Sequence, residues 1–118
     1  MIPLRILLIE DDGLIGLMLG EMLQELGHAI CGIATTESDA VAAAARCRPD
    51  LMIVHARLGP GSGISAVATI LRSGHVAHLF TSGGSTNAYA PGAVVLRKPF
   101  RETELVRAMD RAVAVTAA

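Results

Sequence analysis

The feature that most constrains this fold is a set of short apolar runs that lack the alternation of a half-buried strand. Segments 4–9 and 51–54 read LRILLI and LMIV, which is strand length. A strand without alternation is buried on both faces, as in a parallel sheet covered by helices on both sides. We therefore expect the chain to fold around a buried parallel sheet.

Helix patterns separate the strand-like runs. From the N-cap residue Asp12 to the stop at Gly27, apolar residues recur every three or four positions, which predicts a helix whose stripe faces the core: Ile15, Met18, Leu19, Met22, Leu23 and Leu26. Further helices are expected at 36–46, 63–72 and 102–115, and further strands at 29–33, 77–81 and 94–96. Strands that alternate with helices predict parallel pairing through right-handed crossovers.

Composition limits the class of protein. The 118 residues are 52% hydrophobic, which suits one domain over residues 1–118. Ten basic residues are scattered against eleven acidic ones, so we expect no nucleic-acid partner. No apolar run approaches the roughly 20 residues of a membrane span and no signal peptide is visible, so the expected location is cytoplasmic. Cys31 and Cys47 are expected to be reduced, packed thiols.

Ligand sites of parallel sheets lie beyond the carboxyl ends of the strands. Here the first strand leads into Glu10-Asp11-Asp12, the third into His55, the fourth into Thr81-Ser82 and the fifth into Lys98-Pro99. Lys98 is the only lysine in the chain, so a compact point charge is a specific feature of this position. The Lys98–Pro99 bond is a candidate for a cis peptide.

Four motifs appear at these strand ends in the order RILLIEDD, PDLMIV, FTSG and LRKPF. Together they resemble the response-regulator receiver domain of two-component signalling. The resemblance implies a flavodoxin-like, doubly wound α/β fold with five parallel strands in the order 2-1-3-4-5 and five helices. It also implies an acidic pair that holds Mg²⁺, and an aspartate that accepts a phosphoryl group from a histidine kinase. A hydroxyl and a lysine then hold the phosphoryl oxygens.

Carried onto this chain, the resemblance makes Glu10 and Asp11 the acidic pair, Ser82 the hydroxyl and Lys98 the lysine. The phosphoacceptor position falls on His55, which has no carboxylate, so no acyl phosphate can form there. Phosphorylation of the imidazole is disfavoured, because its nitrogen lies at a different reach and angle and attack geometry is strict.

Formal charges suggest how such a site is balanced. Glu10, Asp11 and Lys98 sum to −2 + 1 = −1, and a protonated His55 brings the total to zero. We therefore expect His55 to act as an internal counter-ion, with weak Mg²⁺ binding at Glu10 and Asp11 and no required cofactor. One imidazole and two carboxylates can also chelate Zn²⁺ or a similar metal. The nearby Lys98 argues against this, and a histidine paired with an acid is favoured.

Two departures from the family pattern concern its switch and its fourth helix. Receivers usually carry an aromatic side chain three residues before the lysine, and here that switch position is Val95. Residues 83–93 read GGSTNAYAPGA, so the fourth helix is expected to be short or absent. Tyr89 is interpreted as a loop aromatic that packs on the sheet. His28 and Arg57 are expected at the surface.

Two functions remain open at this point. The first is a stand-alone, atypical receiver that takes no phosphate on aspartate and acts by binding a protein partner such as a histidine kinase. The second is a proton- or metal-responsive switch in which His55 senses the ion together with Glu10 and Asp11. No nucleophile–base pair outside this site is visible, so enzymatic turnover is not expected.

Overall fold

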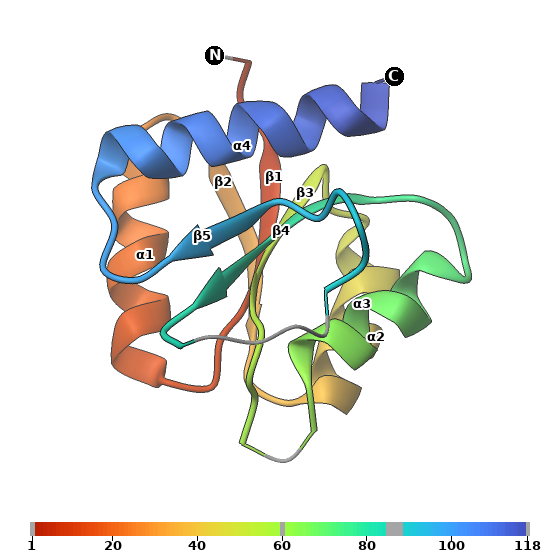
Figure 1. Ribbon diagram of the computed structural model, residues 1–118. Helices are drawn as coiled ribbons and strands as arrows, with labels where there is room; N and C mark the ends of the chain where they lie inside the picture. Colours follow the sequence, from red (N-terminus) through yellow and green to blue (C-terminus); the bar gives the residue numbers. More distant parts are fainter. Residues whose placement is uncertain (1, 60, 85–88, 118) are drawn as a thin grey trace.

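The computed structural model describes residues 2–59, 61–84 and 89–117 (Figure 1). Strands and helices alternate along these residues, as the apolar runs and helix patterns predict. In chain order they are β1 (Arg5–Ile9), α1 (Gly13–Glu25), β2 (Ala29–Ala34), α2 (Glu37–Cys47), β3 (Leu51–His55), α3 (Gly63–Leu71), β4 (Ala77–Ser82), β5 (Val95–Arg97) and α4 (Glu102–Ala117).

The five strands form one parallel sheet in the order β2-β1-β3-β4-β5. The flavodoxin-like fold class expected from the sequence is confirmed. Most strand bounds differ by about one residue from those expected, and β5 begins at Val95 rather than at Val94. The Lys98–Pro99 peptide that follows β5 is cis, as predicted.

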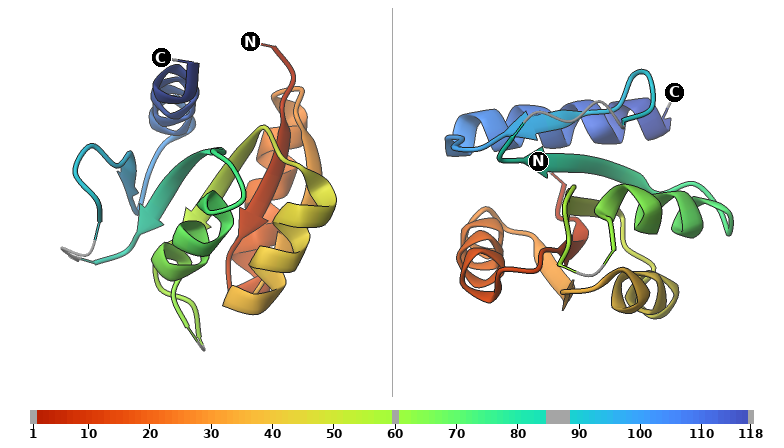
Figure 2. Two further views of the ribbon diagram at one scale, coloured as in Figure 1. Left: turned by 90° about the vertical axis from the view of Figure 1, so that its right-hand side faces the viewer. Right: turned by 60° about the horizontal axis from the view of Figure 1, so that its bottom comes forward.

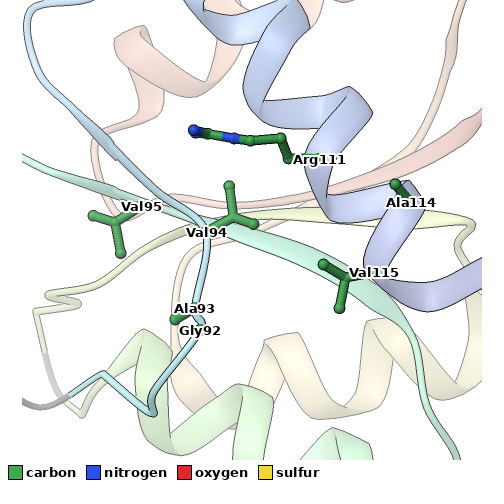
Figure 3. A pocket seen from close by; sticks show the side chains of 7 residues that line it. All are labelled: Gly92, Ala93, Val94, Val95, Arg111, Ala114 and Val115. Carbon is green, nitrogen blue, oxygen red and sulfur yellow. The ribbon is translucent and has the colours of Figure 1, made fainter. Parts of the chain in front are cut away.

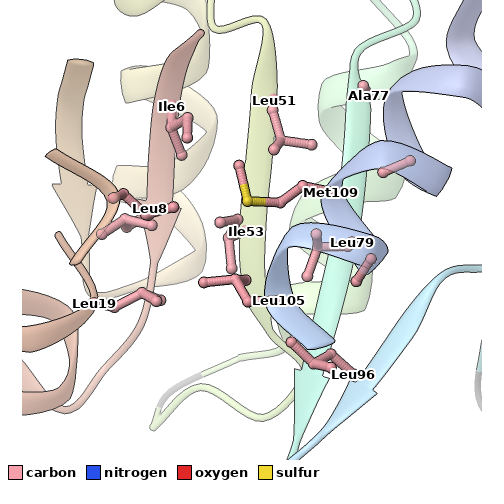
Figure 4. Packing of buried hydrophobic residues seen from close by; sticks show 13 residues of the cluster. Ile6, Leu8, Leu19, Leu51, Ile53, Ala77, Leu79, Leu96, Leu105 and Met109 are labelled. Atoms are coloured by element: carbon pink, nitrogen blue, oxygen red, sulfur yellow. The ribbon is translucent and has the colours of Figure 1, made fainter. Parts of the chain in front are cut away.

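Helices cover both faces of the sheet (Figure 2). On one face, α1 and α4 pack on what we call the α1–α4 cluster (Figure 4), which consists of Ile6, Leu8, Leu19, Leu23, Leu51, Ile53, Ala77, Leu79, Leu96, Leu105, Ala108, Met109 and Ala112. On the other face, α2 and α3 pack on the α2–α3 cluster, which consists of Leu7, Ile9, Ala34, Ala40, Ala43, Ala44, Met52, Val54, Leu58, Ala66, Val67, Ile70 and Phe80.

Side-chain caps begin the first two helices where the sequence predicts. The Asp12 carboxylate accepts hydrogen bonds from the backbone N–H groups of Leu14 and Ile15, at 3.0 and 3.1 Å. The Thr36 hydroxyl accepts one from the N–H of Asp39 at 3.1 Å. Each such cap stabilises a helix by about 1 kcal/mol, because it satisfies N–H groups that have no partner within the helix.

The apolar stripe expected to bury α1 is wrong at two positions. Met18 is 60% exposed and Ile15 is 37% exposed. The buried residues of α1 are instead Gly16, Leu19, Gly20 and Leu23. A β-carbon at Gly16 would lie only 3.2 Å from the side chain of Ile33. The helix therefore approaches the sheet through its glycines, which turns larger apolar side chains toward solvent.

His28 is buried, so its expected surface position is wrong. Only 5% of the residue is exposed, and its ring Nδ1 accepts a hydrogen bond from the backbone N–H of Leu4 at 3.0 Å. That N–H belongs to the residue just before β1, and the buried imidazole supplies its hydrogen-bond acceptor. Burial lowers the pKa of His28 from its ordinary value, because burial disfavours the charged imidazolium.

The connection between β4 and β5 contains no helix among its described residues 83, 84 and 89–94, and residues 85–88 lie outside the description. The structure thus describes four helices rather than five. Tyr89 is half-buried and packs on Phe80, with ring centroids 5.1 Å apart, so its interpretation as a packing aromatic is confirmed. Among the described residues, no helix combines the length and the apolar character that a membrane span needs.

Both cysteines are free thiols, as expected. The Cys47 thiol is buried at the end of α2 and donates to the carbonyl oxygen of Cys31 in β2 at 2.9 Å. Burial, together with the neighbouring Cys47, raises the pKa of Cys31 to about 12. Cys31 is therefore protonated at neutral pH and serves packing.

Candidate functional site

The parallel topology brings three predicted site residues to one edge of the sheet. Glu10 follows β1 directly, His55 ends β3 and Lys98 follows β5. Each lies two residues beyond a member of the α1–α4 cluster, namely Leu8, Ile53 and Leu96. Because strand side chains alternate between faces, all three belong to the same side of the sheet. We call Glu10, Asp11, His55 and Lys98 the site cluster.

Glu10 is the buried carboxylate of the site cluster, with 4% of the residue exposed. Its Oε1 accepts a hydrogen bond from the Lys98 ammonium at 2.9 Å. Its Oε2 accepts one from the backbone N–H of Asp12 at 3.2 Å. Both carboxylate oxygens are therefore partnered within the protein, and the closest cation is Lys98.

The imidazole of His55 contacts the same lysine. Its Nδ1 lies 3.3 Å from the Lys98 Nζ and 3.8 Å from Glu10 Oε1. An ammonium group only donates hydrogen bonds, so this contact is a hydrogen bond only when Nδ1 carries no proton. The Lys98 ammonium is thus closer to the Glu10 carboxylate than the His55 imidazole is. The protonated state expected for His55 stays a prediction.

The donor groups of the site cluster do not fit Mg²⁺. Glu10, Asp11 and His55 each offer a ligand atom, and these atoms lie within 4.8 Å of one another. Mg²⁺ prefers an octahedron of oxygens, whereas one of these three groups is an imidazole nitrogen. The Lys98 ammonium also contacts the buried carboxylate that such an ion would need.

The strand register favours Thr81 over Ser82 as the hydroxyl beside His55. Thr81 is the direct partner of His55 in the β3–β4 pair. It is 2% exposed and follows Leu79 by two residues, which puts it on the side of the site cluster. Ser82 points to the other side, and its hydroxyl donates to the carbonyl oxygen of Gly84 at 2.7 Å. The role given to Ser82 stays a prediction.

The remaining predicted residues lie outside this contact network. Val95 begins β5, pairs with Phe80 and packs half-buried against the α2–α3 cluster. No ring stands at this switch position. Arg57 is exposed, as expected for a solvated loop arginine. His78 pairs with Met52 near the other end of β3, which keeps it away from Glu10.

Glu37 is a residue that no sequence pattern singles out. It begins α2 and accepts hydrogen bonds from the Ser62 N–H at 3.0 Å and the Ser65 hydroxyl at 2.8 Å. These bonds lower the pKa of Glu37. They tie α2 to the loop that follows His55. The partners are 25 and 28 residues away, so no local pattern reveals the contact.

A separate groove lies between β5 and α4 (Figure 3). Its volume is about 530 Å³, and its lining is apolar apart from one cation: Gly92, Ala93, Val94, Val95, Arg111, Ala114 and Val115. It shares no residue with the site cluster.

Comparisons with known proteins identify relatives. The chain is 33% identical to the transcriptional regulatory protein PdtaR of Mycobacterium tuberculosis, over 95% of this chain and 58% of PdtaR. It is 31% identical to the phyllosphere-induced regulator PhyR of Methylorubrum extorquens, over 92% of this chain and 43% of PhyR. The chain therefore spans only about half of these relatives. No protein-family model matches it.

One solved structure matches this chain over nearly the full length of both proteins. The receiver domain of the Erythrobacter litoralis response regulator PhyR superposes with a TM-score of 0.83 and 30% identity, over 95% of this chain and 91% of that domain. Fold and sequence thus agree over nearly the whole of both chains. This chain belongs to the response-regulator receiver family.

Proposed function

We propose that this receiver domain accepts no phosphoryl group on aspartate and signals by binding a protein partner. The observation that carries the proposal is the imidazole of His55 at the end of β3, within 3.8 Å of Glu10. A receiver transfers phosphate to a carboxylate at that strand end, and an imidazole cannot form the acyl phosphate. The site keeps its lysine and buried acid without the nucleophile that they serve.

The Glu10–Lys98 contact supports a site that is stable without phosphate or metal. At 2.9 Å, with only 5% of the Glu10 side chain exposed, this pair has the geometry of a charge-assisted hydrogen bond. Removing one partner of a buried pair leaves an uncompensated charge. The pair therefore favours a single resting state.

The exposed surface of α1 supports association with a partner. Leu14, Leu17 and Met18 are 67, 54 and 60% exposed. We call these three residues the α1 face. Gathered apolar side chains of this size on a small domain are typical of an interaction surface.

Charge around the α1 face indicates the chemistry of the partner. Residues 11–28 contain four acidic residues and no lysine or arginine. Asp11 and Asp12 flank one end of α1, whereas Glu21 and Glu25 are exposed near the other. A complementary surface is apolar with a basic border, because like charges at an interface oppose binding. We infer a protein partner such as a histidine kinase.

Phosphotransfer tests the proposal directly. The chain is incubated with acetyl phosphate and Mg²⁺, and its intact mass is measured. We expect no phosphoryl adduct on the wild type and an adduct on His55→Asp, because that variant restores the carboxylate beside Lys98.

A matched control distinguishes phosphorylation at this site from nonspecific phosphorylation of other carboxylates. In His55→Asp/Lys98→Ala the adduct should fall sharply, because the lysine that holds the phosphoryl oxygens is missing. A hydroxylamine-sensitive adduct on the wild type would overturn the proposal, since it would place an acyl phosphate on another carboxylate.

A further inference from the structure

We propose that the free edge of β2 pairs antiparallel with β2 of a second copy of this chain, so that two protomers share one continuous sheet. The inference goes beyond the proposed function, because it uses no residue of the site cluster. The two can therefore fail separately.

β2 is an edge strand of the sheet. It pairs with β1 on one side, and the strand order puts no described strand on its other side. Its six residues read AICGIA, with no charge and no proline, and only the last of them is buried. Edge strands are usually protected by lysine, by proline or by a covering element. An uncharged edge of this length is therefore open to pairing with another strand.

The sequence of β2 is nearly symmetrical about its centre, which selects a second copy as the partner. In an antiparallel pair centred between Cys31 and Gly32, Ile30 lies opposite Ile33 of the second copy, and the end alanines lie opposite each other. Opposed β-branched side chains are favourable cross-strand pairs. Ile33 is 43% exposed, so the pairing covers an apolar side chain and brings no like charges together.

A bulge in β2 makes this pairing consistent with the two faces of the sheet. Residues directly opposite in an antiparallel pair share a face, whereas residues three apart in a regular strand do not. Between Ile30 and Ile33, β2 contains one extra residue relative to β1. Both isoleucines therefore point to the α1 side, where a β-carbon at Gly16 would lie 3.2 Å from Ile33 and one at Gly20 would lie 3.8 Å from Ile30.

The backbone groups of β2 also suit the pairing. The N–H of Ala29 donates to the carbonyl oxygen of Leu4, and the carbonyl oxygen of Ala34 accepts from the N–H that follows β1, both at 2.9 Å. Backbone groups alternate in direction along a strand, so those of Ile30 and Ile33 point to the free edge. Each Ile30–Ile33 pair can then exchange two hydrogen bonds, as in a regular antiparallel ladder.

Sedimentation velocity of the full chain in reducing buffer, over a range of concentrations, tests the association. We expect a reversible equilibrium between monomer and dimer, and a weak one, because a single short edge is a small interface. Association should stop at the dimer, since each copy has one β2 edge and the twofold pairing uses both.

Hydrogen exchange followed by NMR locates the interface in the wild type. The Ile30 and Ile33 amides should exchange at least about tenfold more slowly at high protein concentration than at low concentration, because the ladder protects them only in the dimer. A chain that stays monomeric at every concentration would overturn the inference. So would a dimer in which these two amides exchange equally fast at both concentrations.

A charge on the edge provides a second test. Ile33→Lys should weaken the dimer at least about tenfold, because it disrupts both symmetry-related pairs. Val115→Lys is the matched control, at another exposed apolar residue but on α4, and should leave the dimer unchanged. Equal dissociation constants for Ile33→Lys and wild type would place the contact elsewhere and contradict the proposal. The exchange measurement uses the wild type alone, so it decides the question even if Ile33→Lys does not fold.

Discussion

At the scale of single residues, the sequence located the site but not its contacts. Glu10, His55 and Lys98 could be predicted because buried parallel strands deliver their last side chains to one edge. Which hydroxyl stands beside His55 depends on register: Thr81 faces His55 across β3 and β4, and a motif that contains both Thr81 and Ser82 cannot distinguish them. The shared contact with Lys98 also required coordinates.

His28 gives the first prediction, which concerns pH. Its pKa in the folded protein lies below the ordinary 6.5, so the unfolded chain binds the proton more readily. The contribution of His28 to stability is complete above about pH 6.5 and is lost as pH falls below that value. Urea unfolding of the wild type between pH 7.5 and 5.5 should therefore show falling stability.

A variant comparison assigns this effect to His28. His28→Gln keeps an acceptor for the Leu4 N–H and removes the titrating group, so its stability should fall less over the same interval. Identical slopes in wild type and His28→Gln would contradict the assignment.

At the scale of elements, α1 shows where a periodic pattern is insufficient. The spacing of apolar residues predicted the helix, its ends and the burial of Leu19 and Leu23, but it also placed Ile15 and Met18 toward the core. Gly16 and Gly20 have no side chain, so hydrophobicity gives them little weight, yet they allow the closest approach to β1 and β2. The helix therefore turns several larger apolar residues toward solvent. This orientation depends on three-dimensional packing and cannot be read from the spacing of apolar residues.

Two glycines predict opposite effects of the same substitution. A β-carbon at Gly20 would meet Leu8 and Ile30 at 3.7 and 3.8 Å, which is ordinary contact. Gly20→Ala should therefore stabilise the protein by about 0.5–1 kcal/mol through helix propensity. At Gly63 a β-carbon would overlap the carbonyl oxygen of His55, so Gly63→Ala should destabilise the protein by more than about 1 kcal/mol.

Chemical denaturation of both variants measures these free energies of unfolding. Gly63→Ala should also disturb the backbone at His55, seen as amide shift changes at the end of β3. A tolerated alanine at Gly63, together with a destabilising one at Gly20, would contradict the packing described for α1 and α3.

Glu37 joins two elements and yields a third prediction. Its carboxylate holds Ser62 and Ser65 at the start of α3, and its pKa is lowered by those hydrogen bonds. The bonds stabilise the protein above the ordinary pKa of about 4.5, and their contribution is lost as pH falls through the lower pKa of the folded state. Glu37→Ala should speed hydrogen exchange of the Ser62 amide at neutral pH.

The matched control is Glu21→Ala, on an exposed position of α1. It should leave exchange at Ser62 unchanged. Unaltered exchange at Ser62 in Glu37→Ala would show that the carboxylate does not hold the loop.

At the scale of the whole molecule, the sheet order and the family could be predicted from four motifs at strand ends. The absence of a helix from the described part of the β4–β5 connection followed from its composition. The single domain over residues 1–118 and the cytoplasmic location stay predictions. The relatives PdtaR and PhyR are longer than this chain, so sequence length alone does not define the working protein.

Partner binding gives the fourth prediction, which belongs to the scale of the whole molecule. Purified dimerisation domains of histidine kinases are used as probes in a pulldown. Leu17→Glu should weaken capture at least tenfold, because it places a charge in the α1 face. Val115→Glu, on α4 at a residue that is 60% exposed against 54% for Leu17, should have no effect. Equal loss in both variants would argue against a surface centred on α1.

The central claim is that the imidazole of His55 lies against the Lys98 ammonium and Glu10. Nitrogen NMR of the histidine rings at neutral pH measures this most directly. The account predicts a clear change in the chemical shift of the His55 Nδ1 in Lys98→Met and in Glu10→Gln, because both partners lie within 3.8 Å of that atom. A His55 ring whose nitrogen shifts are the same in wild type, Lys98→Met and Glu10→Gln would contradict it.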